Sequence, residues 1–69
     1  MTQKELSYFE DAIGHEQNII KILEESIKKI ENEELINFMT NEYNKHNDIL
    51  ERLMNKLEGE ANAWSTYNG

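Results

Sequence analysis

The stretch "KIENEEL", residues 29–35, decides the fold, because the helical hydrophobic pattern changes phase across it. On each side, mostly apolar residues recur at alternating spacings of three and four, the period of a helix that packs along one seam. The first seam runs through Leu6, Phe9, Ile13, Glu16, Ile20, Leu23, Ile27 and Ile30. The second runs through Ile36, Met39, Tyr43, His46, Leu50, Leu53 and Leu57.

The second seam begins two positions later than the first register would place it. That shift is a rotation of about 200° at 3.6 residues per turn, so one straight helix would carry its two apolar stripes on opposite faces. Asn32 can cap a new helix, and Glu33 and Glu34 favour its positive N-terminus. We therefore expect an antiparallel helical hairpin over 1–58, with helices over about 4–31 and 33–58. One unbroken helix in an extended coiled coil is the alternative.

Composition agrees with an all-α chain. There is no proline, and no cysteine for a disulfide, a thiolate metal site or a nucleophile. Fourteen Asp and Glu outnumber seven Lys and Arg, giving a net charge of −7 that disfavours nucleic-acid and membrane-surface partners. The N-terminus is too acidic and polar for a signal peptide, so a cytoplasmic location is expected.

Each expected helix has an apolar stripe wider than one partner can cover. Ala12 and Ile19 widen the first stripe on one side, and Leu35 and Ile49 flank the second. A chain of 69 residues also buries only about 60% of its unfolded surface, which makes a lone monomer marginal. We therefore expect a homodimer that closes a four-helix bundle.

The segment "GEANAWSTYNG", residues 59–69, leaves the pattern after Gly59. Trp64 and Tyr67 are its only large side chains. Two interpretations stand: a helical extension or frayed end whose aromatic side chains cover the rim of the bundle, or a docking segment for a partner.

Polar residues interrupt both seams near their middle, at Glu16 and His46. Glu42 lies on the same helix face as His46, and His15 is adjacent to Glu16. A dimer would double Glu16, Glu42 and His46 into the ligand inventory of a di-iron or di-manganese carboxylate site. However, the usual bundle motif is Glu-x-x-His, and Tyr43 occupies that acid position here. The alternative is a polar pair, without metal, that sets helix register.

The stretch "KELSYFEDAIGHEQNIIK", residues 4–21, resembles the opening of small ferritin-like proteins of endospore-forming bacteria, commonly grouped as spore-coat proteins. "EDAIGHEQ", residues 10–17, carries the resemblance most specifically, and "ENEEL" and "KHNDIL" fit its layout. The resemblance implies a ferritin-like hairpin that dimerises, meets other coat proteins and resides in the spore coat. It also matches His15 and Glu16 to the histidine–glutamate pair of the first helix.

Three functions follow as hypotheses. The first is a structural protein that assembles into a larger layer, the second a di-metal carboxylate protein, and the third a helical adaptor. Catalysis has little support: there is no glycine-rich phosphate loop, and a two-helix hairpin offers little concavity for substrate.

Overall fold

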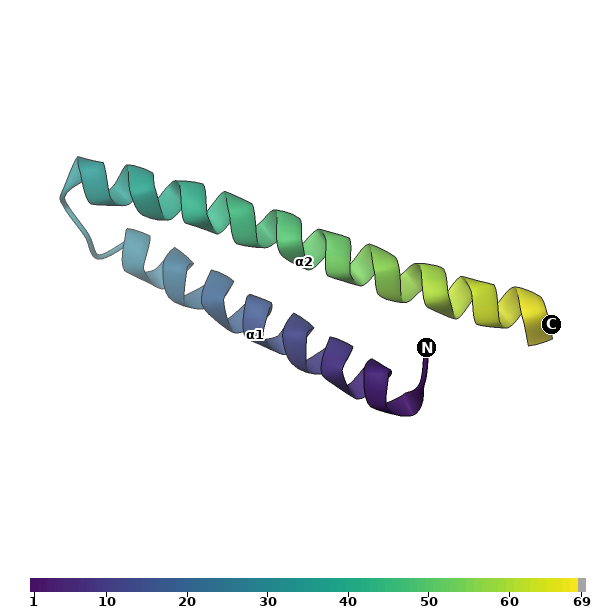
Figure 1. The fold of residues 1–69 in the computed structure, drawn as a ribbon. Coiled ribbons are helices and arrows are strands. Elements are labelled where there is room, and N and C mark those ends of the chain that lie inside the picture. The colour runs from purple at the N-terminus through teal and green to yellow at the C-terminus, as the bar shows by residue number, and fades with distance from the viewer. Residues whose placement is uncertain (69) are drawn as a thin grey trace.

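The computed structural model describes residues 1–68, with side chains described up to Ala63. Two helices, α1 (Gln3–Ile27) and α2 (Glu33–Asn68), lie antiparallel and are joined by a short connection (Figure 1). The described part of the chain contains no strand. This confirms the predicted all-α helical hairpin.

Both helices begin at side chains that satisfy their free backbone amides. At α1, the Thr2 hydroxyl accepts from the amide of Glu5 at 3.1 Å, and the Glu5 carboxylate accepts from the amide of Thr2 at 2.8 Å. This reciprocal arrangement is a capping box. At α2, Asn32 Oδ1 accepts from the amide of Leu35 at 3.1 Å, which confirms the predicted cap.

The helix ends differ from the expected ones. The first helix stops at Ile27 rather than near residue 31, and the amides of Lys29 and Ile30 both bond back to the Ser26 carbonyl. The second continues to Asn68 rather than ending near residue 58. Gly59 lowers helix propensity by only about 1 kcal/mol, which the helix-forming residues after it can offset. The proposed roles of Trp64 and Tyr67 lie outside the described side chains.

The hairpin is one layer thick. Its Cα atoms span 53 × 18 × 13 Å, and α2 runs past the start of α1 (Figure 1). Every predicted seam position is half-buried, but no described side chain is fully buried. The two seams therefore face each other without forming an enclosed core.

Candidate functional site

The two polar seam residues meet at the middle of the hairpin. Nδ1 of His46 lies 2.5 Å from Oε2 of Glu16, and their side chains are 21% and 17% exposed. An ionised carboxylate can only accept, so Nδ1 carries the hydrogen and donates it to Glu16. The pair joins α1 to α2 and satisfies two polar groups that are largely withdrawn from water.

Glu42 is the third member of this group. Its Oε2 lies 3.8 Å from Nε2 of His46, one turn along α2. That separation is too long for a hydrogen bond but within range of an ion pair when the imidazole is charged. His46 thus has a carboxylate beside each ring nitrogen, one from each helix.

His15 takes no part in this group. It is exposed on α1, whereas its neighbour Glu16 faces α2. The structure therefore brings together Glu16, Glu42 and His46 and leaves the fourth predicted ligand outside.

The fit of this group to a metal ion is limited within one chain. No group of three or more His, Asp or Glu side chains among the described residues is arranged to hold a metal. Glu16 already occupies Nδ1 of His46, so an ion at that nitrogen would have to displace the hydrogen bond. Metal binding by Glu16, Glu42, His46 and His15 stays a prediction.

A second feature of the hairpin is a second line of side chains beside each helix seam, again spaced by three and four. We call these two lines together the outer seam. On α1 it consists of Glu5, Tyr8, Ala12, His15, Ile19, Ile22 and Ser26. On α2 it consists of Leu35, Phe38, Glu42, Lys45, Ile49, Arg52 and Lys56.

Both lines of the outer seam border the same side of the hairpin. Two antiparallel helices are related by a two-fold axis perpendicular to the plane that contains both helix axes. Rotation about this axis keeps each side of the layer in place, so equivalent positions of the two helices lie on the same side. Much of the apolar surface here is open to solvent: Tyr8 is 61% exposed and Phe38 is 62% exposed. Ile22 and Leu35 are 52% and 51% exposed. We call this side the apolar face.

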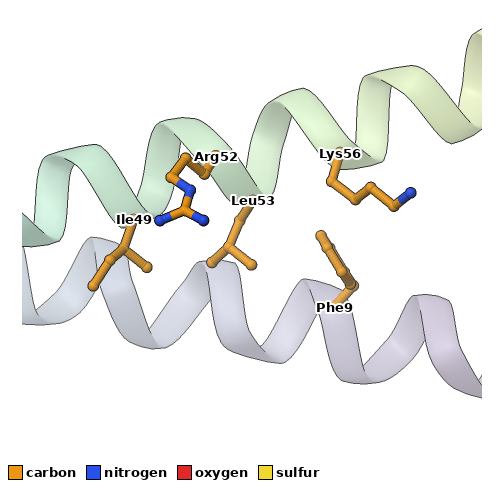
Figure 2. A pocket seen from close by; sticks show the side chains of 5 residues that line it. All are labelled: Phe9, Ile49, Arg52, Leu53 and Lys56. Atoms are coloured by element: carbon orange, nitrogen blue, oxygen red, sulfur yellow. The ribbon is translucent and has the colours of Figure 1, made fainter.

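A shallow hollow of about 290 Å³ marks where the helices meet on the apolar face. Its lining residues are Phe9, Ile49, Arg52, Leu53 and Lys56. Figure 2 shows Phe9 rising from α1 towards α2, with Ile49 and Leu53 pointing back towards α1. The side chains of Arg52 and Lys56 thus border an apolar hollow that an apolar side chain of another molecule could fill.

The opposite side of the hairpin, the polar face, has a different character. Its α1 edge presents Glu10, Gln17 and Glu24. Its hollow on α2 measures about 500 Å³ and is lined by Asn47, Leu50, Glu51, Met54, Asn55 and Glu58. On this face, Met54 is a large apolar side chain that is 49% exposed.

Glu60 is a residue that sequence reasoning missed. It lies three residues after Leu57, so the seam spacing extended by one step would have identified it. Its carboxylate lies 3.7 Å from the Met1 amino group and 4.0 Å from Nζ of Lys56. It is a third polar seam position, at the open end of the hairpin.

No protein-family model, curated protein or solved structure matches the chain. Neither helix, over its described residues, combines the length and apolar character needed to cross a membrane.

Proposed function

We propose that this chain is a small structural protein that assembles through a homodimeric four-helix bundle. The observation that carries the proposal is the absence of any fully buried side chain among those described. A folded domain normally stabilises itself by enclosing a core, and this hairpin has only one layer.

The surface area supports the same conclusion. A compact monomer of 8.2 kDa exposes about 4,500 Å² by the usual scaling with mass. This chain exposes 5686 Å². The single-layer shape contributes to this excess, and pairing two hairpins reduces it.

A place in the spore coat is the biological setting that we propose for this assembly. The resemblance of residues 4–21 to small spore-coat proteins supports it. The large share of the hairpin surface that is open for association supports it as well. Coat proteins are the partners expected beyond the second copy. A fluorescent fusion in sporulating cells should surround the developing spore, and a uniform cytoplasmic signal would contradict this setting.

The mass of the chain in solution tests the assembly itself. Light scattering coupled to size-exclusion chromatography should give at least twice the chain mass of 8.2 kDa. A truncation after Glu58 is the companion variant, because it keeps both seams and removes the overhanging part of α2. An 8.2 kDa species at every concentration would overturn the proposal.

A di-metal carboxylate protein is the second candidate, since a carboxylate flanks each ring nitrogen of His46. Metal content after anaerobic reconstitution with ferrous iron or manganese decides it. About one ion per chain, lost in both Glu16→Leu and His46→Ala, would establish a di-metal bundle. A well-folded dimer without metal would leave the pair with a purely structural role.

A further inference from the structure

We propose that the apolar face of one chain packs against the same face of a second copy, with α2 of each chain stacked on α1 of the other. This inference rests on the proposed function and specifies its interface. The two-fold axis would run parallel to the helices, so both connections would lie at the same end of the bundle.

Seven of the fourteen outer-seam residues are apolar or aromatic and lie along both helices, which favours a helical occupant. Spacings of three and four are what a helix needs in order to meet another helix along its length. Both α1 and α2 carry this second line, immediately beside the line that joins them to each other. A helix with two adjacent seams has two helical neighbours, which is the situation of every helix in a four-helix bundle.

The area of the face suits a second copy. Over the 25 residues of α1 the face is about 37 Å long at 1.5 Å per residue, and it is 18 Å wide across the Cα atoms. The flat footprint is therefore roughly 700 Å². Side-chain relief adds to it, which brings the face close to the ~800 Å² per partner of a standard stable interface.

The position of the charges decides which helices stack. All three basic residues of α2, Lys45, Arg52 and Lys56, belong to the outer seam. Neither Lys45 nor Arg52 forms an ion pair with the described residues. Stacking α2 on α2 would bring these cations from both copies into one seam, where like charges repel. Stacking α2 on α1 separates the two sets.

The levels of the side chains agree with that arrangement. Rotation about an axis parallel to the helices keeps every residue at its own height. In the hairpin Glu16 is level with His46, so Lys56 lies near the height of Glu5 and Phe38 near that of Ile22. The dimer would therefore pair Lys56 with Glu5 of the partner subunit, and Phe38 with Ile22 of the partner subunit. A cation meets an acid, and two exposed apolar side chains cover each other.

Two matched variants test which face is used. Phe38→Glu and Met54→Glu place the same charge on α2, at positions that are 62% and 49% exposed on opposite faces. In sedimentation equilibrium, Phe38→Glu should weaken dimerisation at least tenfold, while Met54→Glu should match the wild type. The reverse order, or equal effects, would overturn the choice of face even if the wild type is a dimer.

Cysteine cross-linking tests which helices stack, and it relies on folded, near-native variants. The chain has no cysteine of its own, so each introduced thiol is unique. With a short bis-maleimide, Ile22→Cys mixed with Phe38→Cys should yield a linked heterodimer, whereas Met54→Cys should stay unlinked. A homodimer linked through His15→Cys would instead show α1 stacked on α1 and overturn the arrangement. A wild type that never dimerises would overturn the proposed function itself.

Discussion

The two sides of the hairpin differ although they are built by the same two helices. The apolar face carries the outer seam, with Phe38 62% exposed, and includes every basic residue of α2. The polar face carries acids and amides, and Met54 interrupts it. Within one hairpin, only the seam lies between the two helices. The large apolar side chains exposed on one side therefore indicate a surface available for association.

Removing apolar side chains from one face should have the largest effect. If Ile22 and Phe38 are covered by a second copy, Ile22→Ser/Phe38→Ser should lose about 3–6 kcal/mol of unfolding free energy, since each buried side chain contributes about 1.5–3 kcal/mol. Met54→Ser on the polar face is the control and should lose no more than about 1.5 kcal/mol, because only about half of that side chain is buried in the hairpin. Urea unfolding at one fixed chain concentration measures both. A double variant as stable as the control would show that the two faces are equivalent.

The next largest effect on stability should come from the pair of Glu16 and His46, in the seam between the two helices. His46→Leu leaves the Glu16 carboxylate half-buried without its partner, which should cost about 1–2 kcal/mol, less than for a fully buried pair. The double variant Glu16→Leu/His46→Leu should recover that loss or exceed wild type, because no unpaired polar group remains. A double-mutant cycle by chemical denaturation gives the coupling energy. Additive losses would mean that the hydrogen bond contributes nothing to the fold.

A glycine substitution tests whether the polar side of α1 is free. A Cβ added at Gly14 would meet nothing within 4 Å, and the residue lies in the middle of α1. Gly14→Ala should therefore stabilise the chain by about 0.5–1 kcal/mol. Gly59→Ala, in equally open space on α2, is the matched control. If only Gly14→Ala lowers the thermal midpoint, a neighbouring chain packs on this side as well.

The smallest effect concerns the start of α1, at the edge of the apolar face. The pKa of Glu5 is lowered from 4.5, mainly by the hydrogen bond from the Thr2 amide and then by the Thr2 hydroxyl. Because the folded-state pKa lies below the unfolded one, this contribution is complete above pH 4.5 and disappears as pH falls through the folded-state pKa. Glu5→Gln should therefore be slightly less stable than wild type at pH 7. Thermal unfolding across pH should show the two curves converging in acid, and a gap that stays constant would contradict the assignment.

Much of the hairpin followed from local pattern. The phase change around residues 29–35 predicted the turn, Asn32 was identified as the cap, and every seam position proved half-buried. The helix ends were harder to predict, because the helix propensities of the residues near Gly59 and Ile30 differ by amounts that small tertiary effects can reverse. The site was predicted in outline. Glu16 and His46 were identified from their seam positions, but the matching of His15 to a functional pair came from resemblance, and His15 is exposed and forms no contact with the group.

The sequence by itself determined that two amphipathic helices form and that they must reverse direction, because periodicity and caps are properties of neighbouring residues. Only the tertiary structure decided that Glu16 bonds His46 and that Glu42 approaches the other ring nitrogen. Those contacts depend on how far one helix slides along the other. Sequence spacing leaves that distance open by about one turn, or 5.4 Å, and side-chain packing between the helices sets it.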